Sequence, residues 1–214
     1  MSHFEFRCNT NIEEIEAKLG SMKKKAPNVL ATAVNDTARD AKRLLAKQAK
    51  EEYSVASSRF QKAMKLEKAK PAKPVAVIRA TGKQMELIDF KTNPKKRIPV
   101  EQVQAKVYKS GGLKPLIKKG ADHNGKDLKS FIVQFQSGHV TVAQRVPGEQ
   151  TTRTIKGANG RTYKVKADKI RSLPAVAIPQ MLKNRKKVYD AVRPVVGEKL
   201  QQNINRRIRK VLGT

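Results

Sequence analysis

The sequence has few of the residues on which disulfides, metal sites and membrane spans depend. It contains one cysteine, Cys8, so neither an intrachain disulfide nor a multi-cysteine metal site can form. Tryptophan is missing and only 5% of the 214 residues are aromatic, so the apolar side chains can form only a modest core. No stretch approaches the roughly 18 apolar residues of a membrane span, and the first residues lack the layout of a signal peptide. We therefore expect no membrane partner and assembly in the cytoplasm.

Acidic residues are also scarce. Asp and Glu number 18 against 47 Lys and Arg, which gives a formal net charge of +29. Because a compact chain with this charge repels itself, a polyanion or an acidic protein is its natural partner. The first 26 residues differ, since residues 1–20 hold four acids and two bases. We treat residues 1–26 as an acidic N-terminal segment, either docking on a neighbouring copy or forming a solvated first helix.

The residues that carry catalysis form no recognisable pattern. The three histidines lack a partner at metal-ligand spacing, and the acids are scattered singly among lysines. The segment from Gly120 to Lys126 has phosphate-loop spacing, but Asp127 stands where that motif needs a hydroxyl for magnesium. A flexible loop is the better interpretation. We predict that the chain is not an enzyme and needs no cofactor or metal.

Hydrophobic periodicity predicts helices at both ends of the chain. A short helix over about residues 11–20 ends at Gly20, and the clearest amphipathic helix runs from Pro27 to about Ala49. A shorter helix is expected to carry Phe60 and Met64. The last helix follows a stripe from Val188 to Val211, with Pro194 either kinking or restarting it.

Between these helices the sequence indicates short strands. Apolar runs separated by Gly, Pro and Asn lie at Val75–Ile78, Met85–Ile88, Ala105–Tyr108, Phe131–Phe135 and Val140–Ala143. Ser137-Gly138 and Asn159-Gly160 predict two hairpin turns, so antiparallel pairing is favoured.

The predicted fold class is therefore α+β: N-terminal helices, an antiparallel sheet of short strands and hairpins, and a C-terminal amphipathic helix. We expect residues 27–214 to form a single domain, with loops at 92–99 and 110–129 and a hairpin insertion around 149–166. The long helix and the C-terminal helix should pack on the sheet.

Two sets of residues are candidates for contacts. The long helix has an Ala-rich stripe that permits close approach of a second subunit, and the candidates there are Ala33, Ala38, Ala41 and Leu45. Basic clusters are either solvated faces or contacts to a polyanion or acidic partner; they comprise Lys95, Lys96, Arg97, Lys118, Lys119, Arg185, Lys186, Lys187, Arg206, Arg207, Arg209 and Lys210.

Six patches in order along the chain resemble the phage minor tail protein Z family. The first is the Ala-rich stretch around Asn35, and the others recur through residues 28–212. The patches are Leu30–Ala38, Met64–Ala69, Met85–Phe90, Ser130–Val133, Val142–Arg145, and Ser172–Val176 with Pro179–Leu182. Their order and spacing carry the resemblance, since no single patch is specific.

The resemblance implies a virion protein that completes the tail near the head–tail junction. Such neck proteins form rings, often of six or twelve copies, against head–tail connector, tail-terminator or tail-tube proteins, with DNA passing through the joint. The family has no catalytic motif.

Two other hypotheses remain open. The charge alone also suits a free nucleic-acid-binding protein that acts through phosphate contacts, although no base-reading module is visible. A DNA-processing enzyme would require acids that converge in the fold.

Overall fold

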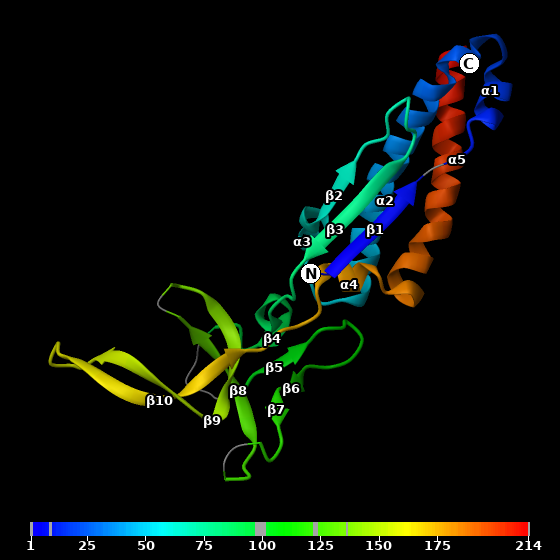
Figure 1. The fold of residues 1–214 in the computed structure, drawn as a ribbon. Helices are drawn as coiled ribbons and strands as arrows, with labels where there is room; N and C mark the ends of the chain where they lie inside the picture. The colour runs from blue at the N-terminus through cyan, green and yellow to red at the C-terminus, as the bar shows by residue number, and fades with distance from the viewer. Residues whose placement is uncertain (1, 9, 97–101, 122–123, 136, 214) are drawn as a thin grey trace. The chain divides into compact units, whose positions relative to one another are not determined.

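The computed structural model describes residues 2–8, 10–96, 102–121, 124–135 and 137–213. Figure 1 shows a chain that divides into two compact units. Unit 1 combines Met1–Gln84 with Val176–Thr214, and unit 2 is the continuous stretch Met85–Ala175. These units differ from the expected acidic segment followed by one domain, because the N-terminal residues pair into a sheet of unit 1 and unit 2 has a core of its own. The α+β fold class is confirmed.

Unit 1 contains a three-stranded antiparallel sheet in the order β1-β3-β2. Strand β1, Ser2–Cys8, pairs along its whole length with β3, Ala76–Gly82, and β2, Met64–Glu67, pairs with the other edge of β3. Phe4, Phe6 and Cys8 alternate with exposed or half-buried residues and are buried. This period-2 pattern is that of a strand with one covered face, and the sequence analysis missed it.

Helices cover the sheet of unit 1. Helix α1, Glu13–Leu19, ends at Gly20, whose φ of 52° favours glycine, and a 3-10 segment leads into α2. Helix α2, Ala26–Glu52, begins with Pro27 in its first turn and contacts all three strands. Helix α3 spans Ser57–Ala63. These three helices are confirmed, except that Met64 begins β2 instead of ending α3.

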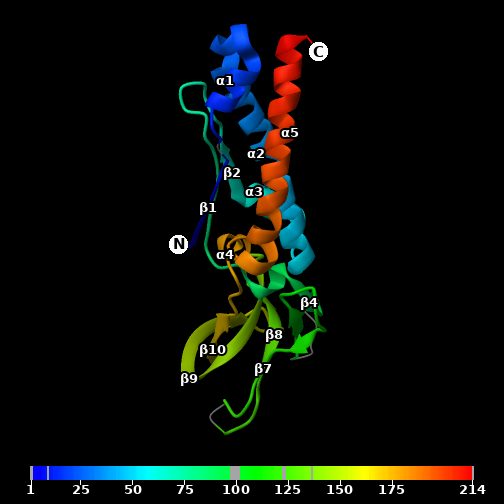
Figure 2. The same ribbon diagram turned by 90° about the vertical axis from the view of Figure 1, so that its right-hand side faces the viewer.

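The C-terminal part of unit 1 returns along α2. Helix α4, Ile178–Leu182, is followed by a π-helical turn, Arg185–Tyr189, and by α5, Asp190–Leu212, which continues through Pro194. Figure 2 shows α5 running beside α2. The expectation that both long helices pack on the sheet is therefore half right: α2 packs on it, and α5 packs on α2.

Unit 2 consists of two antiparallel sheets. One has the order β4-β5-β6, with bounds Lys91–Asn93, Gln104–Lys106 and Lys114–Pro115. The other has the order β10-β9-β8-β7, with bounds Thr162–Ser172, Val140–Lys156, Leu128–Gln134 and Ile117–Lys118. Val103, Ile132 and Val142 form the buried centre between them.

Both predicted hairpins form, and three other predictions for unit 2 change. The Phe135 N–H donates to the His139 carbonyl over 2.8 Å across the first turn, and β9 pairs with β10 across the second. The expected strand Met85–Ile88 is instead a 3-10 turn, Leu87–Asp89, after an isolated bridge at Glu86. The expected loop 110–129 contains β6 and β7 as short edge strands, where Pro115 is tolerated. The loop 92–99 begins inside β4, and its last three residues lie outside the described residues.

Candidate interaction surfaces

A buried carboxylate joins the two long helices of unit 1. Asp36 on α2 is only 8% exposed, and its carboxylate accepts hydrogen bonds from Arg39 on the same helix and from two arginines of α5. Arg206 Nη2 donates to Asp36 Oδ2 over 3.2 Å, and Arg207 Nε donates to the same oxygen over 3.0 Å. Asp36 is therefore the centre of a charge cluster that fixes the register of α5 on α2.

Neighbouring polar side chains extend this cluster through further hydrogen bonds. The Asn203 amide donates to Thr37 Oγ1 over 2.9 Å, and the Thr37 hydroxyl donates to the Ala33 carbonyl over 2.9 Å. Arg206 also donates to Asn203 Oδ1 over 3.0 Å. Because buried polar groups must be paired, this network specifies one alignment of the two helices.

The arginines also determine the charge state of the carboxyl group. Burial raises the pKa of Asp36, but hydrogen bonds from Arg207 and Arg39, together with their positive charges, more than offset this effect. The net result is a pKa below the usual value, so Asp36 is ionised at neutral pH. Sequence reasoning missed this residue, although an acid next to Ala33 and Ala38 on an apolar stripe calls for a cationic partner.

The predicted subunit contacts on α2 lie inside the chain itself. Ala33, Ala38, Ala41 and Leu45 are each 0% exposed in the single chain. Their stripe is covered by elements of the same unit, since α2 packs against the sheet and α5. The close approach that the small side chains permit is therefore intramolecular, and the assignment of these four residues to a subunit interface is wrong.

The predicted basic cluster of α5 divides between the interior and the surface. Arg207 turns toward Asp36, and its side chain is 29% exposed, whereas that of Arg206 is 65% exposed. Arg206, Arg209 and Lys210 line a shallow hollow of about 480 Å³ on α5 together with Gln202 and Asn205. This outer face keeps three exposed cations.

The other predicted cations fall on separate segments. Lys95, Lys96, Lys118 and Lys119 are exposed in unit 2, and Arg97 lies outside the described residues. Arg185, Lys186 and Lys187 are exposed in the π-helical turn of unit 1. Lys187 Nζ is engaged by Glu52 Oε1 at 2.8 Å. The described cations of these clusters are thus distributed over both units.

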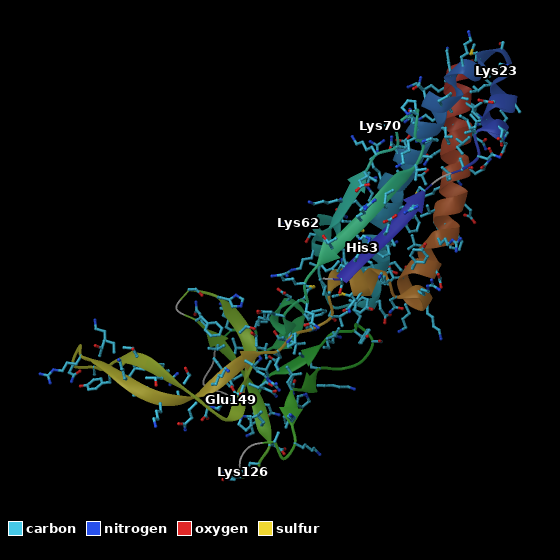
Figure 3. All side chains as sticks on the ribbon, in the orientation of Figure 1. His3, Lys23, Lys62, Lys70, Lys126 and Glu149 are labelled. Atoms are coloured by element: carbon cyan, nitrogen blue, oxygen red, sulfur yellow. The ribbon has the colours of Figure 1, made fainter. Side chains whose placement is uncertain are left out.

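The longest exposed basic element was not among the predicted contacts. We call residues 149–172 the β9–β10 arm; they comprise the end of β9, the turn and β10, whose last residues pair with β9 in the larger sheet of unit 2. Nearly every residue of the arm is exposed, and Figure 3 shows side chains projecting from both sides of it beyond Glu149. The signal in the sequence was a run without acids, from Gln150 to Ala167.

The histidine, cysteine and glycine-rich positions considered in the sequence lie in separate settings. Within them no three His, Cys, Asp or Glu side chains lie close enough to hold a metal ion. His139 pairs with Glu86 at 3.1 Å, and burial raises the pKa of the Cys8 thiol to about 11. In the glycine-rich segment, Asp127 Oδ1 accepts the Gly120 N–H over 3.2 Å, and a strand follows in place of a phosphate-loop helix. No helix in the described ranges has the length and apolarity needed to cross a membrane.

Comparisons of the chain with protein-family models, with curated proteins and with solved structures found no match in any of the three.

Proposed function

We propose that this chain is a structural phage virion protein: a minor tail, or tail-completion, component that forms a ring at the head–tail junction and helps to join tail to head. In this role it turns over no substrate. It acts by binding copies of itself and the neighbouring connector, tail-terminator or tail-tube proteins.

The observation that carries this proposal is how the six patches of the resemblance meet in the fold. Each patch contacts another, so that they form three pairs; two pairs join segments that are distant in the sequence, and the third consists of the two strands of a hairpin. Asn35 of the first patch exchanges two hydrogen bonds with Ala69 of the second, of 3.0 and 2.8 Å.

The other two pairs lie in unit 2. The Leu87 N–H donates to the Leu173 carbonyl over 3.2 Å, and the Ala175 N–H donates to the Met85 carbonyl, which joins the third patch to the sixth. Phe131 of the fourth patch lies opposite Ala143 of the fifth, and the Arg145 guanidinium lies 5.1 Å from the centre of the Phe131 ring. The residues that carry the resemblance thus take part in contacts between different elements of this fold.

The direct test is to delete the gene from the phage that encodes the chain and to image the lysate by electron microscopy. We expect filled heads and free tails that remain unjoined, and a plasmid copy of the gene should restore joined particles. The matched control is the same plasmid with an early stop codon. Joined, infectious particles in the deletion strain would refute the proposal.

Localisation gives a second readout of the same proposal. Peptides of the chain should be present in gradient-purified particles. Their ratio to the portal protein should be fixed and should correspond to one ring of this chain per particle. Native mass spectrometry of the purified chain, alone and with the connector, should show a closed cyclic oligomer of six or twelve copies. Absence of the chain from purified particles would refute the virion role.

A free nucleic-acid-binding protein is the second candidate, favoured by the exposed cations of the arm and of α5. It predicts a chain bound to DNA in the infected cell and missing from finished particles. The particle analysis therefore separates the two candidates.

A further inference from the structure

The β9–β10 arm is a two-stranded ribbon whose register sorts its side chains onto two faces. Directly opposed residues of an antiparallel pair lie on the same face, and the faces alternate along each strand. Three successive pairs on one face each place a lysine opposite a threonine: Lys156–Thr162, Lys164–Thr154 and Lys166–Thr152. We call these six residues the Lys–Thr face.

The opposite face holds the ribbon together. Tyr163 lies directly opposite Ile155, and Val165 lies opposite Arg153. Tyr163 and Ile155 remain 45% and 41% exposed, but an aromatic residue paired with a β-branched residue stabilises a ribbon by about 0.2–1 kcal/mol. This face therefore has a role within the arm.

The turn at the tip of the arm contacts Tyr163. The Asn159 amide donates to the Tyr163 hydroxyl over 2.7 Å. A Cβ at Gly157 would come within 2.8 Å of the Tyr163 ring, so a larger residue there would displace the ring. These contacts give shape to a ribbon that would otherwise be marginal in water.

The charges of the arm are paired at its base and unpaired toward its tip. Lys169 Nζ lies 2.8 Å from Glu149 Oε2, and Arg145 Nε lies 3.5 Å from Asp168 Oδ2. Beyond these acids, residues 150–167 contain five cations and no acid. Across the described part of the chain, no carboxylate lies within ion-pairing distance of Lys156, Lys164 or Lys166. They are therefore available to an external anion.

We propose that the β9–β10 arm binds duplex DNA through its Lys–Thr face, with the lysines and threonine hydroxyls contacting the phosphate backbone. Alternate residues of a strand are about 6.8 Å apart, so the face presents a regular row of cations to a backbone with one charge per roughly 3.4 Å on each strand. A two-stranded ribbon also fits the major groove, which is about 12 Å wide. Binding of this kind is independent of base sequence.

The chemistry of the face favours DNA over a protein partner. Lysine is depleted at protein interfaces, and the Lys–Thr face contains no apolar side chain except the threonine methyls. A second copy of this chain is a poor occupant, because each copy has a net charge of +29. The inference does not depend on the virion role, since the arm would bind DNA in either setting.

The test measures binding of the full chain to a fluorescent 24-base-pair duplex by anisotropy over a series of salt concentrations. The arm variant changes Lys156, Lys164 and Lys166 to Gln. Its matched control changes Lys62, Lys65 and Lys68, three exposed lysines of unit 1, to Gln. Both variants lose the same charge, and circular dichroism checks that each keeps its fold.

We expect the slope of log K against log salt to fall by about 2.7 in the arm variant, because each phosphate contact contributes about 0.9. Affinity near 0.1 M salt should fall by at least about tenfold, and the control should lose much less. Changing the same three lysines to Arg should preserve the slope.

Two results would overturn the proposal. Equal losses in the arm variant and the control would show that only total charge matters. The other is that poly-glutamate, at the same charge concentration as DNA, displaces the duplex from the chain while the arm variant keeps an unchanged salt slope for DNA. That result would point to an acidic protein as the partner of the arm.

Discussion

Asn35 and Ala69 form a reciprocal hydrogen-bonded pair between α2 and the connection that follows β2. The Asn35 side-chain amide donates to the Ala69 carbonyl over 3.0 Å and accepts the Ala69 N–H over 2.8 Å. The side chain thus pairs with the backbone as a neighbouring strand would. It satisfies both polar groups of a residue that is only 6% exposed.

Asn35→Ala should lower the free energy of unfolding by about 1–3 kcal/mol, because it leaves the Ala69 N–H and carbonyl without partners. Urea denaturation followed by circular dichroism measures the loss. Asn28→Ala, at an exposed position of the same helix, should change stability by less than about 0.5 kcal/mol. Equal losses in the two variants would contradict the structural role of the pair.

The contact between Asp36 and Arg207 predicts energetic coupling between α2 and α5. Asp36→Asn and Arg207→Gln should each destabilise the chain, and the double variant should lose less than the sum of the two. The expected coupling energy is about 1–3 kcal/mol, since the residues share one network. A double-mutant cycle in urea measures it, and Glu51→Gln with Arg207→Gln is the uncoupled control cycle. Additivity of the Asp36 cycle would refute the link.

The lowered pKa of Asp36 predicts the pH dependence of this stabilisation. A carboxyl whose pKa is lower in the folded state stabilises the fold fully above its unfolded value, here 3.8, and loses that contribution as the pH falls through the folded pKa. The stability difference between the wild type and Asp36→Asn should therefore be constant from about pH 5 to 8 and shrink in stronger acid. A difference that is unchanged at pH 2 would contradict the assignment.

Ala38 is completely buried between elements of unit 1, so Ala38→Leu should overfill the site. We expect a loss of about 1–3 kcal/mol in unfolding free energy. Ala191→Leu, at an exposed position of α5, should be nearly neutral. If the Ala38 variant unfolds like the wild type, and only its oligomers are disturbed, then the residue faces another subunit after all.

Because Cys8 is buried, we expect its thiol to react slowly. With a pKa of about 11, only about one molecule in a thousand carries the thiolate at pH 8. Reaction with a disulfide reagent should therefore be slow in the native chain and fast in denaturing urea. Equal rates in the two conditions would show that β1 does not hold Cys8 in the sheet.

The sequence predicted the elements whose signals are local. The Ala-rich stripe of α2, the Gly20 stop of α1 and the Asn159-Gly160 turn are each determined by neighbouring residues, and each is found. Strand β1 has a clear alternation of Phe4, Phe6 and Cys8, but its partner strand β3 lies some seventy residues away, and helices α2 and α4 pack against it. The acidic residues after it directed the prediction toward a separate segment.

The contact residues were harder to predict because burial depends on distant partners. The sequence pattern of an Ala-rich stripe does not distinguish a stripe covered by another subunit from one covered by the same chain. In this fold α2 packs against α5 and the sheet, and Ala38 is buried. Likewise, a basic triplet does not reveal that Arg207 turns inward to Asp36 while Arg209 stays exposed. For the arm, the pairing register was needed before its lysines could be assigned to one face.

Unit 1 combines residues 1–84 with residues 176–214, which affects the order in which the units fold during synthesis on the ribosome. The inserted unit is continuous and can fold once Ala175 has left the exit tunnel, whereas unit 1 must wait for α5. Until then α2 lacks its packing against α5, and its apolar stripe around Val34 is incompletely covered. The synthesis of residues 176–214 thus decides when residues 1–84 can complete their unit.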